Sequence, residues 1–240
     1  MAKIIEIHGN IFESSCQTIV NTVNCVGIMG RGIAMEFKNR FPEMYSTYAQ
    51  ICENRQLQPG LLQIWKKSNP WILNFPTKNH WKHPSKLEYV EQGLIKFTET
   101  YMEKGVSSIA FPQLGTSLGG LNWEMVRERM FLHLEPLPNL DVEIYHFDPN
   151  AVDSLFDKLY QKIHRFETRD YKNFLHIKSK QASTIQSALQ ENELRSMMDF
   201  QKLKGVGEKT IEGLYDFARS ERRMRLTTES EIQPSFALSP

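Results

Sequence analysis

Short apolar runs alternate with longer amphipathic stretches over the first part of the chain. The apolar runs predict strands at residues 3–7, 17–20, 61–65, 71–75, 108–111 and 142–147. Apolar positions at helical spacing predict helices at residues 32–39, 43–54, 84–104 and 122–134. Short strands that alternate with helices are typical of a mixed, mostly parallel sheet covered on both faces. We therefore predict a three-layer α/β/α fold for residues 1–150.

The pattern changes after residue 150, where it predicts a small helical region at residues 151–226. Helices are expected at 151–165 and 184–202, and Tyr171 and Phe174 between them are expected to dock on the first unit. Residues 227–240 hold few apolar side chains and are expected to form a flexible tail. The apolar stripe expected along the second helix is Ile185, Leu189, Leu194, Met197, Met198 and Leu203.

A glycine-rich loop separates the second predicted strand from the first helix. Gly27, Gly30 and Gly32 lie in this loop. Glycines let the backbone approach a ligand closely, and the helix N-terminus behind them favours an anion. No Gly-Lys-Ser/Thr follows, so the loop is not a P-loop. The glycines alone also suit an ordinary turn, but Asn21 and Asn24 beside them favour a ligand site.

Two further loops follow predicted strands, at residues 77–80 and 115–120. Ligands of α/β sheets bind beyond the carboxyl ends of the strands. We therefore expect the three loops to meet at one rim of the sheet.

Composition adds mainly exclusions. A net charge of +1 over 240 residues gives no bulk attraction to a polyanion. The three cysteines lack metal or disulfide spacing, which predicts a protein of a reducing compartment, the cytoplasm. His80 and His83 have no third ligand nearby, so no metal is expected. No signal peptide or membrane span is evident.

Six motifs occur in order between residues 3 and 150: HGNIF, NTVNCVG, GIMGRGIAMEFK, FPTKNHW, FPQLGTSLGGLNW and HFDP. Together they resemble the macrodomain family, an ADP-ribose-binding fold. Within that family they are most similar to the DarG type, antitoxins that remove ADP-ribose from DNA and reverse the DarT toxin.

The resemblance implies roles for individual residues. Asn10 replaces an aspartate that holds the adenine amino group, and Phe147 stacks on adenine. Asn21 and Asn24 approach the distal ribose, and Lys78 and Asn21 are the implied catalytic residues. The residues implied to bind ADP-ribose are Gly9, Asn10, Ile11, Asn21, Asn24, Gly30, Arg31, Gly32, Ile33, Thr77, Leu114, Gly115, Thr116, Ser117, Leu118, Gly119 and Phe147.

The chain departs from one branch of the family in the second glycine loop. Terminal ADP-ribose glycohydrolases carry an aspartate there, where this chain has Gly119 or Gly120. The difference disfavours a protein-ester substrate and favours a DNA-linked one. Lys78 could attack C1″ of the distal ribose as a neutral amine, or polarise the bond as a cation, and the sequence leaves both roles open.

The segment LKGVGEKTIEGLYDF, residues 203–217, resembles a helix-hairpin-helix motif. Its glycine turn would aim backbone N–H groups at a DNA phosphate, through Gly205, Gly207, Lys209 and Thr210. A hairpin used only for packing is the alternative. A basic edge is expected from Arg219, Arg222, Arg223 and Arg225.

These observations predict an enzyme that removes ADP-ribose from modified DNA bases, thymine or guanine, without a cofactor. The expected partners are ADP-ribose, ADP-ribosylated DNA and a cognate ADP-ribosyltransferase toxin, with the protein itself a monomer. The alternatives are a non-catalytic ADP-ribose-binding module and a hydrolase of small ADP-ribose derivatives.

Overall fold

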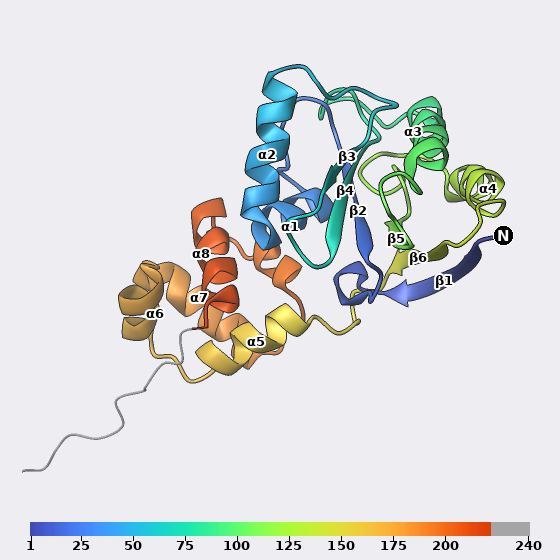
Figure 1. The fold of residues 1–240 in the computed structure, drawn as a ribbon. Coiled ribbons are helices and arrows are strands. Elements are labelled where there is room, and N and C mark those ends of the chain that lie inside the picture. The colour runs from blue at the N-terminus through green and yellow to red at the C-terminus, as the bar shows by residue number, and fades with distance from the viewer. Residues whose placement is uncertain (222–240) are drawn as a thin grey trace, which may run out of the picture.

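A six-stranded mixed sheet forms the centre of the computed structural model, which describes residues 1–221 (Figure 1). The strand order is β1-β6-β5-β2-β4-β3; every pairing is parallel except that of β3 with β4. This confirms the predicted mixed, mostly parallel sheet. The expected tail lies outside the described residues. The strands are β1 (Lys3–Gly9), β2 (Thr18–Val23), β3 (Gln63–Trp65), β4 (Trp71–Pro76), β5 (Ser108–Pro112) and β6 (Asp141–Phe147).

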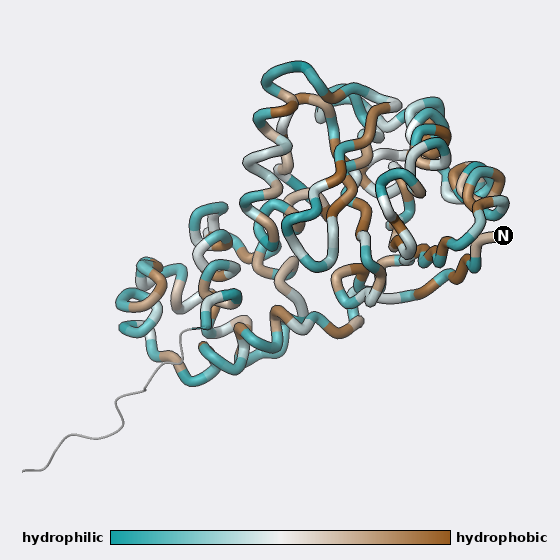
Figure 2. The backbone as a smooth tube through the Cα atoms, in the orientation of Figure 1, coloured by the Kyte–Doolittle hydropathy of each residue, from teal (hydrophilic) through white to brown (hydrophobic). Residues whose placement is uncertain are grey.

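Helices cover both faces of the sheet. The first pair and the second pair of helices lie on opposite sides of the strands in Figure 1. Neighbouring strand residues divide between the two faces: Ile72 packs in the cluster with α1 and α2, and Leu73 in the cluster with α3 and α4. The strands are the most apolar segments in Figure 2. These helices are α1 (Gly32–Arg40), α2 (Pro42–Glu53), α3 (Leu87–Thr100) and α4 (Trp123–Leu134).

Helix α3 is shorter than the predicted 84–104. Lys86 is extended at its start, and turns replace the helix after Thr100. The turns end at Gly105, whose φ of 70° suits glycine. The apolar pattern continues through these turns because Tyr101 and Val106 are also buried, so periodicity alone overestimates the length.

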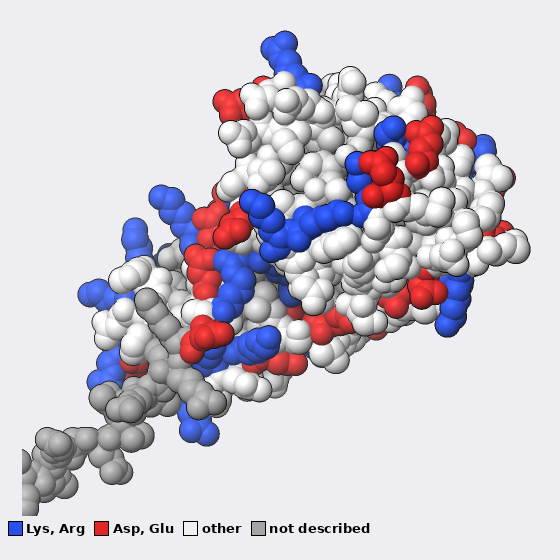
Figure 3. Space-filling model, in the orientation of Figure 1, with Lys and Arg blue, Asp and Glu red and all other residues white. Residues whose placement is uncertain are grey.

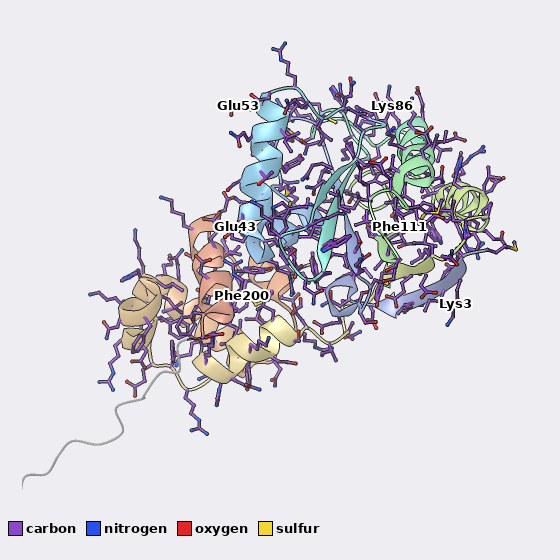
Figure 4. The ribbon with its side chains drawn as sticks, viewed as in Figure 1. Lys3, Glu43, Glu53, Lys86, Phe111 and Phe200 are labelled. Carbon is purple, nitrogen blue, oxygen red and sulfur yellow. The ribbon has the colours of Figure 1, made fainter. Side chains whose placement is uncertain are left out.

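Residues 154–219 form a helical region with its own core. Its elements are α5 (Ser154–Ile163), α6 (Thr168–Leu175), α7 (Ser179–Gln190), the 3₁₀ helix η2 (Met197–Lys202) and α8 (Glu208–Arg219). Tyr171 is fully buried in this core and packs edge-on against the ring of Phe166. Phe174 packs against the same Phe166 ring and is half-exposed. Neither docks on the sheet region as predicted. The separate cores are marked in Figure 4 by Phe111 and Phe200.

The predicted helix 184–202 is broken after α7. Asn192 takes a left-handed φ of 55°, and η2 begins five residues later. Met198 is therefore not part of the apolar core of the helical region, unlike its neighbour Met197.

Charged contacts join the helical region to α1. Arg40 donates to Glu36 at 2.7 Å and to Asp153 at 2.8 Å, and all three side chains are buried. Lys38 pairs with Glu208 and Glu212 of α8. Figure 3 shows the two signs of charge interspersed where the two regions meet. None of the helices among residues 1–221 has the length and apolarity required to cross a membrane.

Candidate active site

A cleft of about 910 Å³ opens at the carboxyl ends of the strands. Residues from all three predicted loops line it, among them Gly30, Thr77 and Gly115. Parallel strands end at the same rim, and this brings together loops that are far apart in the sequence.

The first glycine loop is fastened by Asn24. Its side-chain oxygen accepts from the backbone N–H of Val26 and of Ile28, and Tyr48 donates to its backbone carbonyl at 2.7 Å. Gly32 begins α1 with a φ of 58°. No side chain caps the N-terminus of α1, so its first N–H groups are available to a ligand in the cleft.

The second glycine loop is closely packed. A Cβ at Gly115 would lie 2.9 Å from Leu121 and 3.0 Å from Ser85, and one at Gly119 would overlap the carbonyl of Gly115. Ser85 fixes the loop by donating its N–H to Gly119 O at 2.9 Å. Position 119 therefore requires glycine for steric reasons. A glycine here also means that the loop carries no carboxylate at this position.

Lys78 follows β4 and reaches across to the second loop. Its Nζ donates to the backbone carbonyl of Leu118 at 2.8 Å. Burial lowers the pKa of Lys78, and no described charge contributes to that shift. An amine with this environment loses its proton more easily than a surface lysine. The strand end itself is anchored by Thr77, which is buried beside Ser85.

Asn21 does not line the cleft. It is fully buried on β2, and its amide donates to Asn74 Oδ1 at 2.8 Å and lies near Met29 Sδ. Leu114 is also fully buried outside the lining. The other residues predicted for catalysis or ADP-ribose binding do line the cleft: Gly9, Asn10, Ile11, Asn24, Gly30, Arg31, Gly32, Ile33, Thr77, Lys78, Gly115, Thr116, Ser117, Leu118, Gly119 and Phe147.

The end of the cleft beside β1 and β6 carries an aromatic ring and an amide. Phe147 ends β6 with 63% of its surface exposed, as an open aromatic platform. The oxygen of Asn10 accepts from Phe12 N, and its amide donates to Val152 O. The oxygen of Asn10 keeps a second lone pair for a ligand donor.

The cleft also includes residues that sequence reasoning missed as ligand contacts. Trp81 and Lys82 follow Lys78 in the same loop, so proximity in sequence could have found them. No such signal pointed to Glu36 or Met198, because the sequence predicts Glu36 on a helix and Met198 in an apolar core. The remaining residues of this set are Phe12, Thr22, Val23, Ile28, Ala34, Ser85, Pro112, Gln113 and Tyr145. Over residues 1–221, no three metal-ligating side chains come together.

The Macro domain family model matches residues 20–130. The chain is 43% identical over 143 residues to the DNA ADP-ribosyl glycohydrolase of Thermus aquaticus, and 41% over 141 residues to that of Mycobacterium tuberculosis. These matches cover 58% and 57% of this chain but 40% of each relative, so the chain spans about two-fifths of their length.

Solved structures give the same result. The macrodomain of Thermus aquaticus DarG aligns with a TM-score of 0.59 and 41% identity, covering 61% of this chain and 99% of that one. Thermosipho africanus DarTG in complex with ADP-ribose aligns with a TM-score of 0.57 and 33% identity, covering 62% and 42%. Sequence and fold therefore agree, and the chain belongs to the macrodomain family.

Proposed function

We propose that the protein is a glycohydrolase that removes ADP-ribose from modified DNA bases. The observation that carries this proposal is Lys78, which projects across the cleft to the second glycine loop. Support comes from the 41–43% identity to proteins named DNA ADP-ribosyl glycohydrolases and from the relative whose structure contains ADP-ribose.

The two glycine loops suit the diphosphate of such a ligand. The uncapped N-terminus of α1 offers N–H groups and a partial positive charge, and Arg31 adds a full one at the same rim. Thr116, Ser117 and Leu118 line the opposite side, where the backbone N–H groups of Ser117 and Leu118 are proposed to meet phosphate oxygens. The distal ribose then lies between these loops and Lys78.

Lys78 acts on C1″ as a neutral amine in this proposal. Its Nζ forms a bond to C1″ while the bond from C1″ to the base breaks, and the electron pair leaves with the base, which takes a proton from water. Water then cleaves the lysine–ribose bond and restores the enzyme. An attacking neutral amine gives a rate that rises with pH towards the lowered lysine pKa, whereas a polarising cation gives a rate that falls there.

The hairpin between η2 and α8 is proposed to hold the DNA. Gly205 has a φ of 85°, and a Cβ at Gly205 or Gly207 would meet no atom within 4 Å, so the turn is open to solvent. Lys209 is exposed in the first turn of α8. Arg219, by contrast, donates to Asn39 O and pairs with Asp216, so it contributes less to the expected basic edge; Arg222, Arg223 and Arg225 lie outside the described residues.

A transferase partner is proposed from a relative. The Thermosipho africanus protein, 34% identical over 158 residues, is named a DNA ADP-ribosyl transferase–DNA ADP-ribosyl glycohydrolase fusion. We propose that this chain counteracts such a transferase, as a cytoplasmic monomer that needs no cofactor.

The test uses oligonucleotides that carry ADP-ribose on thymine or on guanine. Release of unmodified DNA and free ADP-ribose is the expected result with one of them. Tight ADP-ribose binding without turnover would instead identify a binding module. Phosphate release from ADP-ribose 1″-phosphate with no activity on DNA would identify a hydrolase of small derivatives.

A further inference from the structure

The helical region contributes a side chain to the cleft. Met198 of η2 lines it together with Asn10, Glu36 and Phe147. The same four residues line a small adjoining hollow, so Met198 and the exposed Phe147 ring belong to one end of the cleft. Met198 is half-buried and lies outside residues 20–130, the part that the family model matches.

The position of Met198 is fixed by a buried network. Ser196 and Asp199 form a capping box that begins η2. The backbone N–H of Met197 donates to Asp153 Oδ2 at 2.9 Å, and the other oxygen of Asp153 accepts from Arg40 at 2.8 Å. Met198 therefore keeps its place relative to α1 without a ligand.

This end of the cleft lies far from Lys78. Phe147 ends β6 and Lys78 follows β4, and the order β6-β5-β2-β4 puts three strand spacings between them. At ~4.8 Å per spacing the two strand ends are roughly 14 Å apart. The Lys78 side chain shortens this distance by reaching towards Leu118 of the second loop. A ligand held at both ends must be elongated, with its diphosphate over the glycine loops in the middle.

The side chains at this end suit a flat heteroaromatic ring. Phe147 offers a free aromatic face, and the thioether of Met198 is flexible, polarisable and favourable against aromatic rings. Asn10 supplies a polar edge with both donor and acceptor capacity.

We propose that Met198 is a ligand-contact residue that holds the purine base of the substrate against Phe147. The helical region is then a structural part of the binding site, not only a DNA-holding attachment. This inference rests on the proposed function, because it takes ADP-ribose as the occupant of the cleft.

Calorimetry on the full chain with ADP-ribose, ADP and inorganic diphosphate tests it. Met198→Ala should weaken ADP-ribose and ADP by about fivefold to tenfold, since it removes part of one apolar wall. Binding of inorganic diphosphate should not change. Met198→Leu should remain within about twofold of the wild type, because it keeps the apolar volume.

Met125→Ala is the matched control, an exposed methionine on α4 that does not line the cleft. In turnover assays Met198→Ala should raise KM and leave kcat unchanged, as expected for a group that binds substrate and transition state equally. If the wild type binds ADP-ribose and Met198→Ala binds it with equal affinity, the inference is overturned and the proposed function stands. Absence of wild-type ADP-ribose binding would overturn both.

Discussion

A glycine turn that leads into a helix occurs twice in this chain, once in the cleft and once on the open surface. Gly30 precedes α1 and Gly32 begins it, both in the lining of the cleft, whereas Gly205 and Gly207 precede α8 on the open surface. Each turn leads into a helix N-terminus, a position that favours anions. The enclosed turn can surround a small diphosphate, and the open one can meet only the surface of a larger polyanion. The surroundings of the turn therefore distinguish the two proposed ligands.

The regions around these turns also differ in how they are held. The cleft is built on sheet strands, with loops packed against one another. The helical region has its own apolar core and is joined to α1 by the buried Arg40, Glu36 and Asp153. Burial raises the pKa of Glu36 in this junction.

Breaking the junction should have the largest effect on stability. Asp153→Ala leaves Arg40 with one buried partner, removes the N-cap of α5 and releases Met197 N. We expect a loss of about 3–5 kcal/mol in the free energy of unfolding, measured by urea denaturation. Glu103→Ala, which breaks a pair with Lys104 on the surface, is the control. A loss below about 1 kcal/mol for Asp153→Ala would show that the two regions are not joined through this network.

The two glycine turns can be compared with one substitution at each site. Gly119→Ala places a methyl group against the carbonyl of Gly115, so the second loop must move away from the diphosphate. ADP-ribose affinity should fall about 100-fold, or about 2.7 kcal/mol, by calorimetry. Gly207→Ala adds the same methyl group in open space at a φ of −92°, and should leave ADP-ribose affinity unchanged. Equal effects at the two positions would contradict the separation of the sites.

A smaller effect is expected at the hairpin. Lys209→Ala removes an exposed cation from the first turn of α8 and should weaken binding of unmodified duplex DNA by a few-fold, about 1 kcal/mol or less. The slope of log affinity against log salt should fall by about one, measured by fluorescence anisotropy. ADP-ribose binding should be unaffected. An unchanged salt slope would favour a hairpin used only for packing.

The strand ends were predictable because short apolar runs alternate with helical stretches along the chain, and the end of each run marks the end of a strand. The three loops met as expected for this reason. Asn21 shows the limit: it lies two residues before the end of β2, fully buried and bonded to Asn74, whereas Thr22 and Val23 at the strand end line the cleft. The residues alone do not reveal which of two adjacent polar side chains faces the ligand.

Met198 shows a different limit. Its apolar character and helical spacing predict a place in the apolar core. The left-handed turn at Asn192 breaks the predicted helix and turns Met198 towards the cleft instead. Breaks of this kind depend on tertiary contacts such as that of Met197 N with Asp153. Contributions from the helical region to the cleft therefore became visible only in three dimensions.

The central claim is that Lys78 carries the chemistry in a cleft built to hold ADP-ribose. The most direct measurement is the single-turnover rate on an ADP-ribosylated oligonucleotide for the wild type, Lys78→Ala and Lys67→Ala. Lys67 is an exposed lysine at the opposite end of β4 and serves as the control. Lys78→Ala should lose at least about 100-fold in this rate and retain ADP-ribose binding, and Lys67→Ala should keep the wild-type rate. A Lys78→Ala variant that releases unmodified DNA at the wild-type rate would contradict it.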